Sequence, residues 1–159
     1  MGGLADGAIQ WGHSFSGSVV PGGEMNTEHT TYVDDRYPLS AETARILAAA
    51  QEVHRYLGPG FEEVIYQRAL AKELPVHGLE YSREVWIDVL YKGEKVGRKR
   101  VDFMIGAGDE SVMVEIKAKA ALEDVDFVQA LSYLKASGCR VGLLINFGAK
   151  RLGIKRLAN

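Results

Sequence analysis

The chain has 159 residues, of which 47% are hydrophobic and 25% are charged, and its formal net charge is −2. These values are typical of one globular domain that is long enough to bury a core. The small net charge excludes a global attraction to nucleic acid, so any such binding must come from a local patch.

The single cysteine, Cys139, cannot form an intrachain disulfide and has no Cys or His neighbour at metal-ligand spacing. We therefore expect a buried thiol and a reducing compartment. No stretch approaches the ~18 apolar residues of a membrane span. The N-terminus also lacks the basic start and apolar run of a signal peptide. The sequence thus favours a cytoplasmic protein that does not bind membranes.

Residues 1–38 differ in composition from the rest of the chain. Glycines interrupt this segment, and no period of 2 or 3.6 residues is sustained. We interpret the segment as a Gly-rich N-terminal tail that is flexible or is ordered by contact with another surface. Met25 is a second candidate for the start of the chain. The predicted folded domain occupies residues 39–159.

Two helices are predicted at the start of this domain. The first begins near Ser40, an N-cap residue, and keeps apolar residues at helical spacing until Gly58-Pro59-Gly60 stops it. The second runs from about Phe61 to Leu74, and Pro75 ends it. Its predicted apolar positions are Phe61, Val64, Ile65, Ala69 and Leu70.

A strand is predicted over Tyr81–Tyr91, with a hairpin turn at Lys92-Gly93-Glu94. Placing Val85 opposite Val101, so that the apolar faces match, requires an odd loop length, and we expect three residues. The next two strands, Arg98–Ile105 and Ser111–Lys119, are predicted to form a second hairpin.

This second hairpin is expected to fold around a two-residue loop, Gly108-Asp109, and its side chains alternate between two faces. One face is a predicted core face, with Val101, Phe103 and Ile105 against Val112, Val114 and Ile116. The other face places Asp102 opposite Glu115, Arg100 opposite Lys117, and Arg98 opposite Lys119.

Like charges directly opposite each other destabilise a sheet, so the charged face indicates a bound partner. Two carboxylates are explained by a cation between them, and neighbouring cations by an anion that lies across them. A metal ion together with a phosphate chain would satisfy both conditions. The alternative interpretation is a solvated outer face with mixed charges. A shift of register by two residues would keep the same residues on this face.

Divalent ions such as Mg²⁺ take oxygen ligands and usually only one or two protein carboxylates. We expect an ion held by Asp102, Glu115 and the backbone carbonyl of Ile116. Such an ion can lower the pKa of a bound water and neutralise charge on a phosphodiester. Lys117 would orient that water or stabilise the developing charge. The residues expected to bind flanking phosphates are Arg98, Arg100 and Lys119.

A third helix is predicted over about Glu123–Ala136, and Asp126, Gln129 and Tyr133 share one of its faces. Taken alone, Gln129 and Tyr133 are interpreted as solvent-facing. Similarly, Glu63 in the first turn of the second helix can simply complement the helix dipole.

Two more strands follow, an apolar one over Arg140–Phe147 and a short one over Arg151–Leu157. The element order is then ααβββαββ, which predicts an α/β sandwich around a mixed sheet.

The segment Leu57–Tyr66 contains the pattern Gly-x-x-Glu-x-x-Tyr, formed by Gly60, Glu63 and Tyr66. In this pattern the chain resembles the GxxExxY proteins, a small bacterial and archaeal family of the PD-(D/E)xK nuclease superfamily. The resemblance covers about residues 40 to 157. It continues through Asp102, Glu115-Ile116-Lys117, Gln129 with Tyr133, and Gly142–Gly148.

The resemblance implies a restriction-endonuclease-like core, with a central mixed β-sheet flanked by helices. It also implies a metal-dependent nuclease that uses Mg²⁺ or Mn²⁺ and acts on DNA. Val101, instead of a proline, precedes Asp102, which removes no ligand. The catalytic residues implied are Glu63, Asp102, Glu115, Lys117, Gln129 and Tyr133, with Glu63 as a further candidate metal ligand.

Two alternatives from other classes remain open. A non-catalytic module that binds nucleic acid or protein would be expected to have lost a site residue, and none of the implied residues is missing. A structural subunit would use the Gly-rich tail as an assembly arm in a homo-oligomer or a larger complex. The sequence does not distinguish DNA from RNA as substrate, or an endonuclease from an exonuclease.

Overall fold

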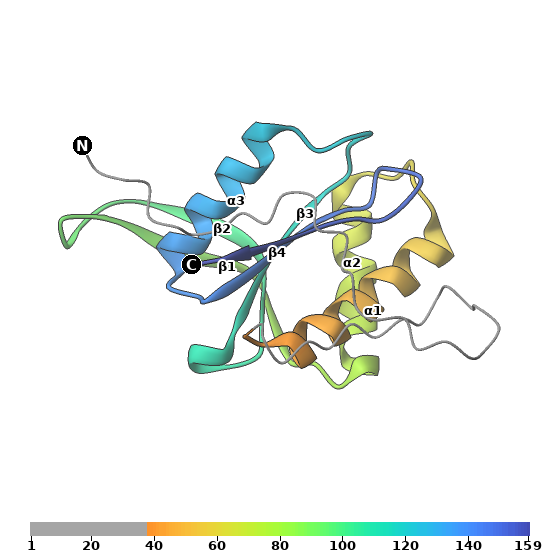
Figure 1. The fold of residues 1–159 in the computed structure, drawn as a ribbon, viewed down its shortest axis with the longest axis horizontal. Coiled ribbons are helices and arrows are strands. Elements are labelled where there is room, and N and C mark those ends of the chain that lie inside the picture. The colour runs from red at the N-terminus through yellow and green to blue at the C-terminus, as the bar shows by residue number, and fades with distance from the viewer. Residues whose placement is uncertain (1–37) are drawn as a thin grey trace.

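The computed structural model describes residues 38–159, so the predicted Gly-rich tail, apart from Pro38, lies outside the described residues. The element order is the predicted ααβββαββ. The elements, shown in Figure 1, are α1 (Ser40–Leu57), α2 (Glu63–Glu73), β1 (Tyr81–Tyr91), β2 (Glu94–Ile105), β3 (Val112–Lys117), α3 (Asp124–Ser137), β4 (Val141–Asn146) and β5 (Gly153–Ala158).

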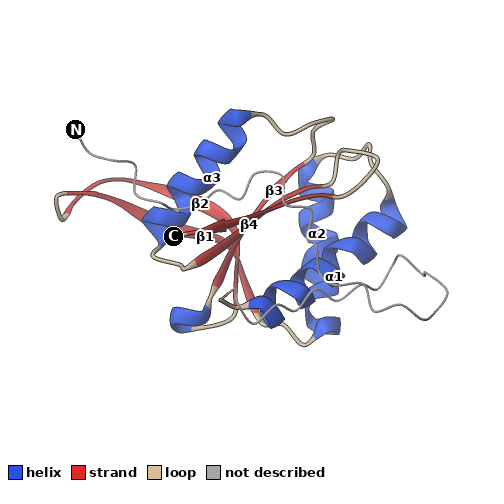
Figure 2. Cartoon of the chain, in the orientation of Figure 1, coloured by secondary structure: helices blue, strands red, loops and turns tan. Residues whose placement is uncertain are grey.

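The five strands form one mixed sheet in the order β1-β2-β3-β4-β5, in which only β3 and β4 run parallel. Helices α1 and α2 cover one face and α3 covers the other (Figure 2). This is the predicted α/β architecture. No helix within residues 38–159 has the length and apolar character needed to cross a bilayer.

Each face of the sheet has its own core. The α1/α2 core includes Phe103 and Ile105, as predicted, but Val101 belongs to the α3 core. The predicted single core face of β2 is therefore wrong. On β1, Glu84 has a φ of 53°, and the ladder is interrupted there because Arg83 pairs with Phe103 and Val85 pairs with Val101. This irregularity rotates the strand pair, so the residues on either side of it face different helices.

The register of β2 against β3 agrees with the prediction, since Phe103 lies opposite Val114. However, this ladder ends at that pair, and the connection spans residues 106–111 instead of a two-residue loop. The predicted pairs of Arg100 with Lys117 and Arg98 with Lys119 do not form. The residues of β2 that precede Phe103 pair with β1 only. The two strands form a ribbon there, the β1–β2 ribbon, which extends past the helices (Figure 1).

The turn of this ribbon contains two residues, Lys92 and Gly93, instead of the predicted three. Their φ angles of 49° and 84° fit a turn with both central residues left-handed, the type that matches strand twist. Val85 still lies opposite Val101, as predicted, because a bulge between Val89 and Leu90 supplies the extra residue.

The buried face of α2 also differs from the prediction. Phe61 and Val64 are 49% and 40% exposed, whereas Tyr66 is fully buried in the α1/α2 core. The helix begins at Glu63, so Phe61 precedes it. Two smaller expectations have mixed outcomes. Leu39, and not Ser40, occupies the N-cap of α1, and the thiol of Cys139 is buried as expected.

Candidate active site

The point where β2 and β3 separate carries the two predicted strand acids. The Asp102 N–H donates to Glu115 Oε1 at 3.1 Å, and the Ile116 N–H donates to Asp102 Oδ2 at 2.8 Å. These side chains accept from the backbone N–H groups that the broken ladder leaves without a strand partner. We call Asp102, Glu115 and Ile116 the β2–β3 fork.

The two fork carboxyl groups disfavour each other's charge. Burial, together with the nearby charge of Asp102, raises the pKa of Glu115 to about 8. Burial also raises the pKa of Asp102, although the Ile116 N–H and Lys117 oppose that rise. Together the two groups therefore carry less than two negative charges near neutral pH. A cation placed between them would favour the fully ionised form.

Glu63 approaches the fork from α2. Burial raises its pKa, Asp102 raises it further, and Lys117 lowers it. The start of α2 is fixed by the Tyr66 hydroxyl, which donates to Gly58 O at 2.6 Å and accepts from the Phe61 N–H at 3.1 Å. Gly60, with a φ of 113°, allows the turn between these two contacts. The Gly-x-x-Glu-x-x-Tyr pattern thus fastens the loop that positions Glu63.

Gln67 is a site residue that the sequence interpretation missed. Its amide Nε2 donates to Asp102 Oδ1 at 2.9 Å, so it holds the carboxylate from the α2 side. Gln67 lies one helical turn after Glu63, on the same face. This spacing of four residues was the sequence signal from which Gln67 could have been predicted as a site residue.

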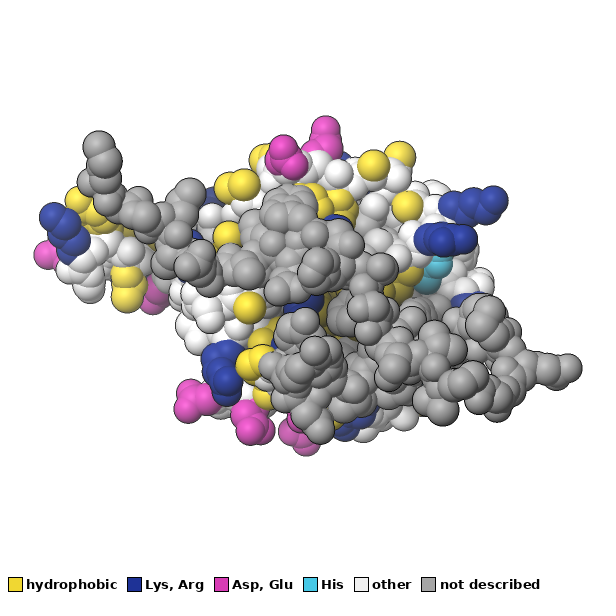
Figure 3. All heavy atoms as spheres, viewed as in Figure 1, with side chains coloured by type: hydrophobic (Ala, Val, Ile, Leu, Met, Phe, Trp, Pro, Cys, Tyr) yellow, Lys and Arg dark blue, Asp and Glu magenta, His cyan; other side chains and the backbone are white. Residues whose placement is uncertain are grey.

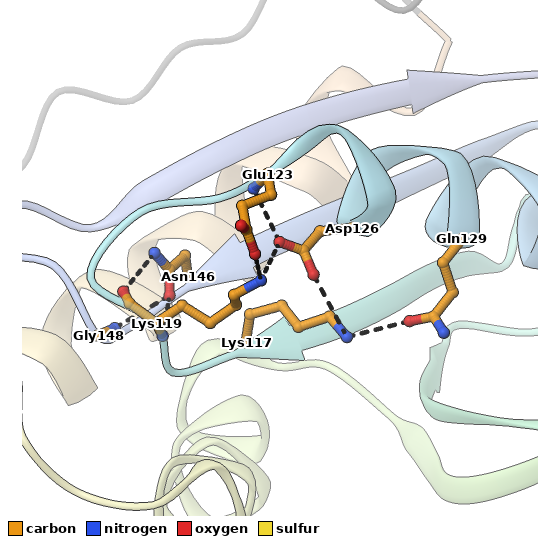
Figure 4. A network of polar contacts seen from close by, with 7 residues as sticks. All are labelled: Lys117, Lys119, Glu123, Asp126, Gln129, Asn146 and Gly148. Carbon is orange, nitrogen blue, oxygen red and sulfur yellow. Dashed lines mark hydrogen bonds and ion pairs between the residues drawn. The ribbon is translucent and has the colours of Figure 1, made fainter.

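The lysines of the site are held from α3 (Figure 4). Lys117 Nζ donates to Gln129 Oε1 at 3.0 Å and lies 3.9 Å from Asp126 Oδ1. Lys119 Nζ contacts Asp126 Oδ2 at 2.8 Å and Glu123 Oε2 at 2.5 Å. Asp126, buried between the two lysines, was predicted to share a helix face with Gln129 but was not predicted to be a site residue.

The pKa shifts in this lysine cluster favour the charged forms. Burial would raise the pKa of Asp126, but the hydrogen bonds from Lys119 and from the Glu123 backbone N–H bring it below its usual range. Hydrogen bonds to Asp126 and Glu123 raise the pKa of Lys119. Nearby, burial followed by the charges of Glu115 and Asp102 raises the pKa of Tyr133, so its hydroxyl stays protonated.

The segment that carries the lysines is braced by the end of β4. The side chain of Asn146 accepts from the Lys119 N–H and donates to the Lys119 carbonyl, both at 2.9 Å. The Phe147 N–H donates to the Lys117 carbonyl at 2.9 Å. A Cβ atom at Gly148 would lie 2.5 Å from Ala118 C and Lys119 O, so only glycine fits there.

The three predicted phosphate-binding residues are not side by side. Arg98 and Arg100 are exposed on the ribbon, with their guanidinium carbons 4.3 and 5.8 Å from the centre of the Trp86 ring. Arg100 also lies 3.7 Å from Glu84. Lys119 is paired with Glu123 and Asp126, two acids at the start of α3, and would have to exchange one of them to bind a phosphate.

The fork fits a divalent ion that keeps most of its ligands outside the protein. Within residues 38–159, no group of three or more His, Cys, Asp or Glu side chains is close enough to form a metal cluster. Two carboxylates suffice for Mg²⁺, and each carboxylate retains lone pairs beyond its present hydrogen bonds. The Ile116 carbonyl points to the same strand edge as its N–H, towards Asp102.

The fold defines the class of domain: an α/β core with a five-stranded mixed sheet flanked by helices, as in restriction-endonuclease-like proteins. A family model agrees, because the PD-(D/E)XK nuclease superfamily matches residues 40–157. The chain belongs to that superfamily. Nucleases of this superfamily generally depend on a divalent metal, and membership suggests nucleic-acid binding.

A search of curated proteins finds no match. Among solved structures, the crystal structure of the protein SSO0001 is similar, at 16% identity over 75% of this chain and with a TM-score of 0.47. The chain spans 58% of the length of that protein.

Proposed function

We propose that this domain is a metal-dependent nuclease that hydrolyses phosphodiester bonds, with DNA as its substrate. The observation that supports this most directly is the β2–β3 fork, where the buried Glu115 and the half-buried Asp102, both with raised pKa values, lie near Lys117. Superfamily membership makes the same chemistry the first expectation, although fold alone would not establish it.

In this proposal, Asp102, Glu115 and the Ile116 carbonyl hold Mg²⁺ or Mn²⁺, and Glu63 is an additional ligand or contacts it through water. The ion would supply Lewis-acid stabilisation of the phosphodiester and activation of water. Gln67 and the backbone N–H groups keep the two fork carboxylates in place.

The remaining site residues orient protons and charge. Gln129 accepts from Lys117 and so directs its ammonium group, which would hydrogen-bond to the attacking water or to the reacting phosphate. Tyr133, protonated at neutral pH, can donate its hydroxyl hydrogen to a phosphate oxygen. Arg98, Arg100 and Lys119 remain the proposed contacts to flanking phosphates. Asp126 positions both lysines and is not a catalytic residue in this scheme.

Three finer assignments belong to the proposal. Membership of the GxxExxY family is supported by the fastening role of Gly60 and Tyr66 around Glu63. A cytoplasmic location is supported by the single buried cysteine. Assembly into a homo-oligomer or a larger complex remains a proposal for the full chain.

The direct test is incubation of the full chain with single-stranded and double-stranded DNA and RNA, with Mg²⁺, with Mn²⁺ and with EDTA. We expect metal-dependent cleavage that Lys117→Ala removes. Lys135→Ala, which changes an exposed lysine on α3, is the matched control and should cleave as the wild type does.

Two results would contradict the proposal. The first is nucleic-acid binding without cleavage under any of these conditions, which would favour the non-catalytic binding module. The second is cleavage that survives in Lys117→Ala, since this would assign the activity to a contaminant or to another site.

A further inference from the structure

The β1–β2 ribbon carries a net positive charge, unlike the chain as a whole. Its residues 85–101 carry five cationic and two anionic side chains, a net charge of +3, whereas the whole chain has a net charge of −2. Asp88 is paired with Lys95 at 2.6 Å. Within residues 38–159, no ion pair is found for Arg98 or Lys99. In Figure 3, basic and apolar side chains lie together at the end of the molecule where Figure 1 places the ribbon turn.

The two faces of the ribbon differ. Ile87 and Val101 pack into the α3 core, so the face that carries them is covered. The opposite face carries Trp86, which is 53% exposed, together with Arg98 and Arg100. Arg98, stacked on the Trp86 ring, keeps its N–H edge available for a phosphate, whereas Arg100 also lies 3.7 Å from Glu84 and would exchange that contact for a phosphate.

We propose that this ribbon is an arm that lies in a groove of B-form duplex DNA and holds it against the fork. This inference rests on the proposed function and adds to it the form of the substrate and the element that grips it. The major groove, about 12 Å wide, admits a two-stranded β-ribbon. The positive charge of the ribbon complements the phosphates on either side of the groove.

The spacing along β2 connects the arm to the fork. Arg98 precedes Asp102 by four residues, which is about 13 Å of extended strand. Because B-DNA rises about 3.4 Å per base pair, that distance corresponds to about four base pairs. A duplex held by Arg98 and Arg100 therefore reaches the fork within half a helical turn. The base pairs that the ribbon covers should lie on one side of the cleavage site.

Charged residues on an exposed ribbon can also prevent edge-to-edge aggregation. That explanation accounts for the lysines, but it does not require arginines stacked on an exposed tryptophan. A second copy of the chain is another conceivable occupant, since Leu90, Tyr91 and Val96 are exposed near the turn.

Binding is measured in EDTA, where cleavage cannot occur, with the full chain and a fluorescein-labelled duplex DNA of about 30 base pairs. The arm variant is Arg98→Ala/Arg100→Ala. Its control is Lys150→Ala/Arg151→Ala, which removes the same charge from exposed residues between β4 and β5. Trp86→Ala removes the stacking surface without changing charge, and Trp86→Phe should restore most of the binding.

We expect the arm variant to weaken duplex binding about tenfold or more and to reduce the slope of log K against log [salt] by about two, with little change in the control. An RNA duplex of the same sequence should bind more weakly, because its deep and narrow major groove excludes the ribbon.

The proposal is overturned if both double variants weaken binding equally, if the wild type does not bind duplex DNA at low salt, or if DNA and RNA duplexes bind alike. A lower oligomeric mass of the arm variant in sedimentation would instead assign the ribbon to contact between copies. Arm-dependent binding without cleavage would contradict the proposed function alone. Cleavage with arm-independent binding would contradict this inference alone.

Discussion

The β2–β3 fork and the lysine cluster are neighbouring groups of charged side chains, but their charges are balanced differently. The lysine cluster consists of Lys117, Lys119, Glu123 and Asp126. In the lysine cluster, Asp126 and Lys119 have pKa values shifted towards their ionised forms because each faces an opposite charge. In the fork, Asp102 and Glu115 have pKa values shifted towards the neutral form. A cluster that is already neutralised stabilises the fold, whereas one with unbalanced charge is suited to a ligand.

The largest expected difference between the two groups is in the effect that removing a charge has on the cleavage rate. Asp102→Asn and Glu115→Gln each keep an oxygen that can accept the backbone N–H but remove the charge that an ion needs. We expect each to reduce the initial rate of metal-dependent cleavage on the order of 10²–10³-fold. Glu123→Gln, the exposed acid of the lysine cluster, should change the rate less than about threefold. Equal losses in all three variants would break the distinction.

The apo protein should lose stability as pH rises from about 4.5 to about 8. Burial and Asp102 raise the pKa of Glu115 to about 8 from a usual value near 4.5, so the folded state binds more protons than the unfolded state in this window. Stability then falls with pH by up to about 1.4 kcal/mol per unit for one proton. Urea denaturation in EDTA at several pH values measures this slope. Glu115→Gln should flatten it, and an unchanged slope in that variant would contradict the assignment.

The brace of the lysine segment can be tested by adding one methyl group. Gly148→Ala places a Cβ against the backbone of Ala118 and Lys119, and we expect a loss of about 1–3 kcal/mol in the free energy of unfolding. Gly97→Ala is the matched control, since its Cβ would meet nothing within 4 Å, and it should change stability by less than about 0.5 kcal/mol. Similar stabilities for the two variants would show that the close approach at Gly148 is not maintained in solution.

The smallest effect is expected at the rim of the lysine cluster. The Glu123 side chain is 68% exposed, so Glu123→Gln should cost less than about 1 kcal/mol despite its contact with Lys119. Thermal unfolding at low and high salt measures this cost, and the difference from wild type should shrink at high salt. A cost above 2 kcal/mol that is independent of salt would mean that Glu123 belongs to the buried part of the cluster.

Much of the fold can be predicted from local patterns in the sequence. The order of helices and strands was predicted from apolar periodicity and from helix stops such as Gly58-Pro59-Gly60 and Pro75. The β2–β3 register was predicted from the alternation of side chains on both strands. The ribbon turn was predicted one residue too long because a bulge leaves no sequence signal there. Burial of Tyr66 was missed because its hydroxyl partners, Gly58 and Phe61, become visible only once the loop is folded.

For the candidate site, the sequence placed Asp102 next to Glu115, and the structure brings them together. It did not indicate that the ladder ends at that point, because a strand fork depends on the rotation at Glu84 and on the packing of two helices. Consequently Arg98 and Arg100 were expected beside the lysines but lie on the ribbon. Gln67 and Asp126 act on other side chains from separate helices, which single-chain spacing reveals only weakly.

The most direct test of the fork as an ion site is thermal unfolding as a function of Mn²⁺ concentration, without nucleic acid. We expect the melting temperature of the wild type to rise with Mn²⁺ by mass action, and that of Asp102→Asn/Glu115→Gln to stay constant. Asp109→Asn/Glu110→Gln, which removes the same charge from the exposed β2–β3 connection, should respond as the wild type does. Equal shifts in the fork variant and the wild type would contradict an ion site between Asp102 and Glu115.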